Sequence, residues 1–371
     1  MKKPEALYQV TLYITEDRRH SPFVVEGLLE LEKQNYIKLK IKTLPIYIHN
    51  RYVLSSGKFM FKKKGYPWCI ELVVLETKTR KSIRIGIDLQ DWVDQFSFHS
   101  FQKCDLVYKR ALTADSLKDI NKNRGDFVIP FGPNCGATVT DKRFLKINKK
   151  IYLRNLVFKA FLNPIKAIDK IMQYSLRGPI KQITAGTDGL LKNPPQKKYI
   201  FFQVQYYNWN SNHSKALNEF RANIIRRLKT AFKDNFYGGM WFQGKIEKKY
   251  ADCISNVDTK YEIYSSFMNN ASIVISTNGF GDSIPWKIVE YMRSGRCIVS
   301  QKNKHIFREP IHKDTVANFE SPDECIKICK KLLNDNATTS RMAQQSRQYY
   351  EDYLKPSAVM EQIINQSVRL L

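Results

Sequence analysis

Residues 271–300 combine an apolar strand, a glycine-containing turn and a helix that carries ionisable side chains. Gly279 and Gly281 in the turn let the backbone adopt positive φ and approach a ligand closely. A helix is predicted to start near Asp282 and Ser283, and its first N–H groups would lack intrahelical partners. Because those groups and the helix dipole favour an anion, the segment predicts a phosphate site.

One face of the predicted helix, which looks along the ligand cleft, carries Ser283, Lys287, Glu290 and Ser294. Lys287 can offset phosphate charge, and Glu290 can accept hydrogen bonds from sugar or ribose hydroxyls. Ligands of open α/β sheets bind at the carboxyl ends of the strands, where this turn lies. The alternative is a structural role, with Asp282 capping the helix and Lys287 and Glu290 forming a surface pair.

The elements that would position this site alternate between strand and helix along the chain. Strand-like runs at 199–205, 237–242, 273–277 and 297–300 are interleaved with helical segments, such as those at 214–232 and 285–294. This alternation predicts α/β units with mainly parallel sheets flanked by helices. The first half has weaker runs of the same kind, and it is interrupted by an irregular excursion at residues 44–68.

The length of 371 residues predicts two domains. The best linker candidate is formed by Gly178-Pro179 and by the stretch at residues 186–195, which contains a Pro-Pro pair and breaks both periodicities. We therefore predict an N-terminal α/β domain over residues 1–190, a C-terminal one over 191–355, and a tail helix over 356–371.

The chain carries 61 Lys and Arg against 35 Asp and Glu, a net charge of +26. Such an excess attracts polyanions, although a general bias toward lysine would also produce it. Residues 142–181 are basic and amphipathic, a pattern that can lie in the headgroup layer of an anionic membrane. The alternative is an ordinary surface helix with one buried face.

Other compositional features narrow the expected setting. The chain has no run of 18 apolar residues, so no membrane-spanning helix is expected. The N-terminus lacks the pattern of a signal peptide, and the seven Cys are scattered without a paired motif. We therefore expect a cytoplasmic protein with reduced thiols and no metal site.

The motif at 281–299 resembles the C-terminal signature of GT-B glycosyltransferases, of the group 1 and exostosin-like types. Group 1 enzymes carry two acids separated by seven residues, then a small-residue turn and an apolar strand. Here Asp282 and Glu290 have that spacing, followed by Arg-Ser-Gly-Arg and Cys-Ile-Val at 293–299. Gly-Asp-Ser-Ile-Pro at 281–285 is similar to the exostosin-like version. Two departures are that the first acid is Asp, and that Gly-Phe-Gly precedes it.

The resemblance implies two Rossmann-like domains with a cleft between them. The enzyme would transfer a sugar from a nucleotide-diphosphate sugar on the C-terminal domain to a glycan or lipid-linked acceptor on the N-terminal domain. Basic side chains and helix N–H groups would stabilise the leaving diphosphate, with no metal or other cofactor. Arg221, one turn into the first helix of the C-terminal domain, is the basic residue implied to reach the diphosphate. The alternative for Arg221 is a solvated helix position.

An inverting transfer needs a general base in the N-terminal domain. The candidates at strand ends or adjoining loops are Asp88, Asp91 and His20. Asp91 can instead cap a helix, and His20 can be a solvated loop residue. A retaining enzyme would need no such base, and the sequence leaves both outcomes open.

Two other functional classes fit parts of the pattern. A basic nucleic-acid-binding protein would suit the charge, although no helix-turn-helix, zinc or RNP-type motif is present, so no nucleic-acid partner is expected. A GT-B-like epimerase or phosphorylase would suit the predicted fold. Salt-dependent nucleic-acid binding and product analysis would separate these alternatives from a transferase.

Overall fold

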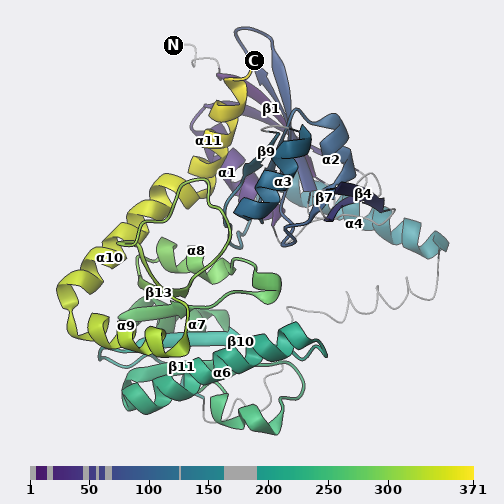
Figure 1. Ribbon diagram of the computed structural model, residues 1–371. Helices are drawn as coiled ribbons and strands as arrows, with labels where there is room; N and C mark the ends of the chain where they lie inside the picture. The colour runs from purple at the N-terminus through teal and green to yellow at the C-terminus, as the bar shows by residue number, and fades with distance from the viewer. Residues whose placement is uncertain are drawn as a thin grey trace. The chain divides into compact units, whose positions relative to one another are not determined.

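Figure 1 shows the chain as a computed structural model that divides into two compact units. Unit 1 is Met1–Leu176 with Lys304–Pro310 and Asp352–Leu371, and unit 2 is Arg177–Asn303 with Ile311–Glu351. The structure describes residues 6–14, 20–44, 50–55, 58–62, 69–124, 127–162 and 190–371. Residues 163–181 of the basic segment, and residues 178–179 and 186–189 of the predicted linker, therefore lie outside the described residues.

Unit 1 is built on a six-stranded mixed sheet with the order β2-β1-β5-β6-β8-β9. Strand β1 pairs with β2 in parallel, and β6, β8 and β9 are also parallel to one another. Every strand of this sheet except β5 therefore has its carboxyl end at the same edge. The strands are β1 (Tyr8–Ile14), β2 (Ile37–Thr43), β5 (Cys69–Glu76), β6 (Ser82–Asp88), β8 (Leu106–Lys109) and β9 (Val128–Pro130).

One strand of unit 1 departs from the otherwise parallel arrangement of its sheet. Strand β5 runs antiparallel to both β1 and β6. A short turn joins β5 to β6, with Arg80 at φ 62°, and a connection this short can only return the chain antiparallel. The alternating sequence signalled the strands but not their direction.

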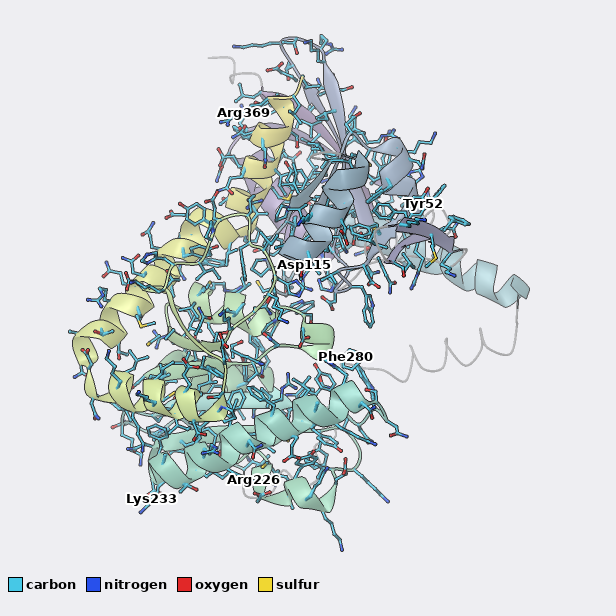
Figure 2. All side chains as sticks on the ribbon, viewed as in Figure 1. Tyr52, Asp115, Arg226, Lys233, Phe280 and Arg369 are labelled. Carbon is cyan, nitrogen blue, oxygen red and sulfur yellow. The ribbon has the colours of Figure 1, made fainter. Side chains whose placement is uncertain are left out.

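The excursion at residues 44–68 also contains regular structure. Strands β3 (Arg51–Ser55) and β4 (Lys58–Lys62) pair antiparallel, and β7 (Gln95–Ser97) joins them in a separate three-stranded sheet. The ring of Tyr52, labelled in Figure 2, packs against the rings of Phe59 and Phe98, whose centroids are 5.7 and 4.8 Å away. Aromatic packing thus holds this small sheet together.

The helices of unit 1 include one from the C-terminal end of the chain. Helix α11 packs along α1, and the two helices lie next to each other in Figure 1. A Cβ added to Gly27 of α1 would lie 2.2 Å from the Pro356 carbonyl oxygen, so only glycine permits this approach. The helices are α1 (Ser21–Lys33), α2 (Phe98–Lys103), α3 (Ala114–Arg124), α4 (Lys142–Leu162) and α11 (Pro356–Val368).

Unit 2 is built on a five-stranded sheet with the order β11-β10-β12-β13-β14, and all of its pairs are parallel. Counted along the chain, its strands lie in the order 2-1-3-4-5 of doubly wound folds. Its core residues are contributed by the strands and by α6, α9 and α10. The strands are β10 (Ile200–Gln205), β11 (Phe236–Trp241), β12 (Ile273–Ser276), β13 (Cys297–Gln301) and β14 (Val316–Phe319).

Amphipathic helices connect these strands, as the periodicity predicts. Ser211 begins α6 because its side chain accepts the Ser214 N–H, and Ser321 caps α9 through the Glu324 N–H. A π-helical turn, Tyr350–Leu354, follows α10. The helices of unit 2 are α6 (Asn212–Phe232), α7 (Tyr261–Asn270), α8 (Trp286–Arg293), α9 (Pro322–Asn334) and α10 (Asn336–Tyr349).

The predicted fold class, α/β with two Rossmann-like units, is confirmed. In the part of the chain that the structure describes, no helix is both long and apolar enough to span a bilayer.

Candidate functional site

The strand order of unit 2 places a switch point between β10 and β12. At such a point the chain leaves adjacent strands toward opposite faces of the sheet, and ligands of this fold class bind outside the carboxyl ends of the strands. Strand β10 ends at Gln205, and β12 ends at Ser276, directly before the predicted phosphate turn. The candidate site is therefore built on the ends of these two strands.

Arg221 joins the two strand ends. Its guanidinium donates to the Gln205 carbonyl oxygen at 2.8 Å, and to Thr277 Oγ1 at 3.2 Å and the Asn278 carbonyl oxygen at 2.8 Å. The Tyr207 ring lies 5.2 Å from the guanidinium carbon. The side chain is 4% exposed, and burial lowers its pKa. The alternative of a solvated helix arginine is therefore wrong, because α6 turns this position toward the sheet.

Lys287 reaches the same place from α8. Its ammonium donates to the carbonyl oxygen of Gln203 in β10 and lies 4.9 Å from the centroid of the Tyr264 ring. Burial lowers the pKa of Lys287 to about 8, and the positive charge of Arg221 lowers it as well. The two cations therefore converge on the ends of β10 and β12.

Glu290 is the carboxylate of this cluster. It is half-buried, one helical turn after Lys287, and its charge raises the Lys287 pKa against the effect of burial. The Tyr264 hydroxyl donates to Glu290 Oε2 at 3.4 Å. Tyr264 belongs to α7, and no feature of the sequence pointed to it. It thus contacts both predicted residues of α8.

The predicted helix start near Asp282 is wrong. A short 3-10 turn spans Phe280–Asp282, and α8 begins only at Trp286, after Pro285. Gly281 and Asp282 have φ of 67° and 57°, which an α-helix cannot contain. Pro285 also disfavours helical conformation in the residue before it. Ser283 consequently lies outside α8 and does not share the face of Lys287 and Glu290.

The N–H groups of the predicted phosphate turn are used within the protein. Gly279 N–H donates to the Ser283 carbonyl oxygen at 2.8 Å, and Gly281 N–H donates to His213 Nε2 at 2.9 Å. Asn278 N–H donates to Gln301 Oε1 at 3.0 Å. In this conformation the turn is braced by its neighbours, and the positive charge at the strand ends comes from side chains.

An aromatic group lies beside the turn. Phe280, labelled in Figure 2, meets the Trp209 ring at 4.6 Å and the His213 ring at 5.0 Å between centroids. Trp209 is 54% exposed. No sequence pattern pointed to His213, although its position at the start of α6, after β10, places it at the same sheet edge.

Residues 219–365 match the model of the family described as Glycosyl transferase-like. The match includes α8 and the switch-point residues Arg221, Lys287 and Glu290. No match is found among the curated proteins.

Several solved structures resemble the chain at low identity. The Anabaena protein HepE, in complex with UDP and glucose, is 12% identical over 74% of this chain and 65% of its own, with a TM-score of 0.40. WaaG, a glycosyltransferase involved in lipopolysaccharide biosynthesis, is 11% identical over 73% of this chain and 66% of its own (TM-score 0.36). A TarM variant from S. aureus is 9% identical over 96% of this chain and 99% of its own, with a TM-score of 0.38.

Outside the matched residues 219–365, Asp88 lies at the carboxyl edge of the sheet of unit 1. It is the last residue of β6 and pairs in register with Lys109 of β8. Lys109 Nζ lies 3.2 Å from Asp88 Oδ1, and both side chains are buried. Asp88 Oδ1 also accepts the Gln90 N–H at 3.1 Å. The structure therefore places this candidate base in a buried ion pair.

The other two base candidates belong to one chain of contacts at the same edge. Asp91 forms an ion pair with Arg110. Arg110 Nε donates to Asn134 Oδ1 at 2.7 Å, and Asn134 Nδ2 lies 3.3 Å from His20 Nδ1. His20 is buried and directly precedes α1, so the alternative of a solvated loop residue is wrong. Neither Arg110 nor Asn134 was predicted, because their contacts join residues far apart in sequence.

Among the described residues, no group of three or more His, Cys, Asp or Glu side chains is arranged to hold a metal ion.

Proposed function

We propose that the chain transfers a sugar from a nucleotide-diphosphate sugar to an acceptor hydroxyl, and that unit 2 binds the donor. Arg221 and Lys287 carry the proposal, because both are desolvated cations at the switch point. Within the described residues, Arg221 donates only to uncharged oxygens. A buried cation without an anionic partner is costly, and a bound diphosphate would supply the missing charge.

In this proposal each part of the cluster has a role in the reaction. Lys287 neutralises charge that develops on the leaving diphosphate, without a metal ion. Glu290 accepts hydrogen bonds from hydroxyls of the donor. Arg221 positions the ends of β10 and β12 and adds positive charge beneath them. Gly279, Gly281, Asp282 and Ser283 belong to the turn that borders the site.

The acceptor and the location of the enzyme are further parts of the proposal. HepE is named as binding UDP and glucose, and WaaG as acting in lipopolysaccharide biosynthesis. For this chain we propose a hexosyl transfer onto a glycan or lipid-linked acceptor in surface polysaccharide or glycolipid synthesis. The enzyme would act in the cytoplasm, at the inner face of the membrane.

A thermal-shift screen with UDP, GDP, CMP and dTDP sugars tests donor binding. Ligand at about 100 times its dissociation constant stabilises the folded state by about 2.7 kcal/mol, which is a measurable shift in melting temperature. We expect one nucleotide series to stabilise the chain, and the Lys287→Gln variant to lose most of that shift. Lys330→Gln, at an exposed lysine of α9, is the matched control. No shift with any nucleotide would contradict the proposal, and a steep salt-dependent affinity for RNA or DNA would then favour a nucleic-acid binder.

Binding of the identified nucleotide diphosphate should weaken as the pH rises above about 8. Below that pH the Lys287 ammonium is charged and attracts the diphosphate, whereas above it the folded protein loses the proton. Linkage to one proton limits the loss of affinity to about tenfold per pH unit. Calorimetry between about pH 7.5 and about pH 9 measures it. Lys287→Arg keeps the charge and should flatten the profile, while an equally steep profile in that variant would contradict the role of Lys287.

The basic helix α4 is proposed to bind an anionic membrane surface. Leu145 and Leu153 are 50% and 49% exposed on a helix rich in Lys and Arg. We expect flotation of the chain with vesicles that contain anionic lipid at low salt, and release at high salt. Replacement of both leucines by Ser should weaken flotation several-fold. A chain that stays unbound at low salt would rule out this role.

A further inference from the structure

The contacts at the carboxyl edge of unit 1 determine where His20 carries its proton. Arg110 is 2% exposed, and its Nε can only donate a hydrogen bond. The atom of Asn134 that lies 2.7 Å from it is therefore the amide oxygen. That contact fixes the orientation of the Asn134 amide, which is otherwise ambiguous.

The orientation of Asn134 has a direct consequence for the imidazole. Asn134 Nδ2, which carries two hydrogens and no lone pair for bonding, faces His20 Nδ1 at 3.3 Å. Nδ1 must then accept, so it carries no proton. A neutral imidazole has one proton, which is left on Nε2. An imidazolium would set two donors against each other near the positive charge of Arg110.

We propose that Arg110, acting through Asn134, holds His20 as the neutral tautomer with its proton on Nε2. His20 is then a hydrogen-bond donor at the carboxyl edge of the sheet, and not the general base considered from the sequence. Arg110 and Asn134 are positioning residues. The tautomer stands on the geometry of unit 1 alone, whereas the role of His20 toward a ligand oxygen rests on the proposed function.

The second unit contains a natural reference with the opposite tautomer. His213 Nε2 accepts the Gly281 N–H at 2.9 Å, so a neutral His213 carries its proton on Nδ1. The same chain thus holds one histidine of each kind, and one spectrum can compare them.

Long-range proton–nitrogen NMR of the full chain, labelled with ¹⁵N at its six histidines, reads both tautomers without any ligand. His20→Gln and His213→Gln each remove one set of signals and so assign them. At neutral pH we expect a protonated Nε2 and an unprotonated Nδ1 for His20, and the reverse for His213. A protonated His20 Nδ1 in the parent chain would overturn the proposal, whatever the variants do.

Asn134→Asp tests whether Asn134 sets the tautomer. A carboxylate at this position only accepts, so His20 Nδ1 should gain a proton while Arg110 keeps its partner. A folded variant in which Nδ1 stays unprotonated would overturn the positioning role. A variant that does not fold leaves the decision to the parent spectrum.

The donor role is tested by the release of UDP from a UDP-sugar that stabilises the chain. His20→Gln keeps an N–H near the Nε2 position and should retain turnover within about tenfold, whereas His20→Ala should lose more. Removal of a general base costs about 10² to 10⁴ in rate, so an equal loss of that size in both variants would overturn the donor role. Failure of the proposed function would appear instead as no turnover in the parent chain, with the tautomer still readable by NMR.

Discussion

Replacement of Glu290 by Gln is expected to lower sugar transfer about 100-fold and to leave the fold intact. The change keeps the size of the side chain but removes a charged acceptor, and a hydrogen bond to a charged group contributes about 1.5–3 kcal/mol. Glu290 is half-buried on α8 and contacts the Tyr264 hydroxyl, which an amide oxygen can still accept. Turnover is measured as nucleotide release and stability as thermal unfolding.

Glu262→Gln provides the matched control for this variant. Glu262 is exposed on the first turn of α7, so its replacement should change neither transfer nor stability by a measurable amount. A folded Glu290→Gln protein with near-normal transfer would contradict the assignment of the donor site to this cluster.

The Glu290→Gln variant should also shift the titration of Lys287. The negative charge of Glu290 raises the Lys287 pKa, so its removal should move that pKa below about 8. Nucleotide binding would then begin to weaken at a lower pH than in the parent chain. This coupling separates loss of the Glu290 charge from a general disturbance of α8.

The fold of unit 2 could be predicted well because its elements are set by local patterns. The apolar stripe of α6 and the buried runs of β10 and β12 signal themselves through periodicity. Strand β14, four residues long with two of them buried, was not predicted because so short a run gives no clear period. The helix at 285–294 was predicted, but the earlier start near Asp282 was wrong because of the positive φ at Asp282, which the residue type does not reveal.

Only the part of the candidate site that lies on helix α8 could be predicted from the sequence. Lys287 and Glu290 share a helical face, which the spacing in sequence determines. Tyr264 and His213 come from other elements, and pairing of each with the site depends on tertiary packing. For the same reason, Asp88, Asp91 and His20 could each be predicted as candidates, but their partners Lys109, Arg110 and Asn134 could not.

The largest effect on stability is expected at the buried pair of Asp88 and Lys109. Removal of one partner breaks a buried ion pair, which costs about 3–5 kcal/mol. Asp88→Asn and Lys109→Met should each lower the free energy of unfolding by about that amount, as measured by denaturant titration. Lys103→Met, at an exposed lysine of α2, should change it by less than about 0.5 kcal/mol.

The double variant, Asp88→Asn with Lys109→Met, tests whether the single variants lose stability because they break the buried ion pair. The amide introduced by the first change keeps an oxygen for the Gln90 N–H, and the thioether introduced by the second fills much of the lysine volume without charge. Most of the lost stability should therefore return. Single variants that cost less than about 1 kcal/mol would contradict the buried ion pair.

The same double variant also tests whether Asp88 takes part in the reaction. Because Lys109 engages the Asp88 carboxylate in a buried pair, we expect the double variant to retain sugar transfer. A stable double variant that has lost transfer by about 10² or more would restore Asp88 as the general base of the reaction, since removal of such a base costs at least that much in rate.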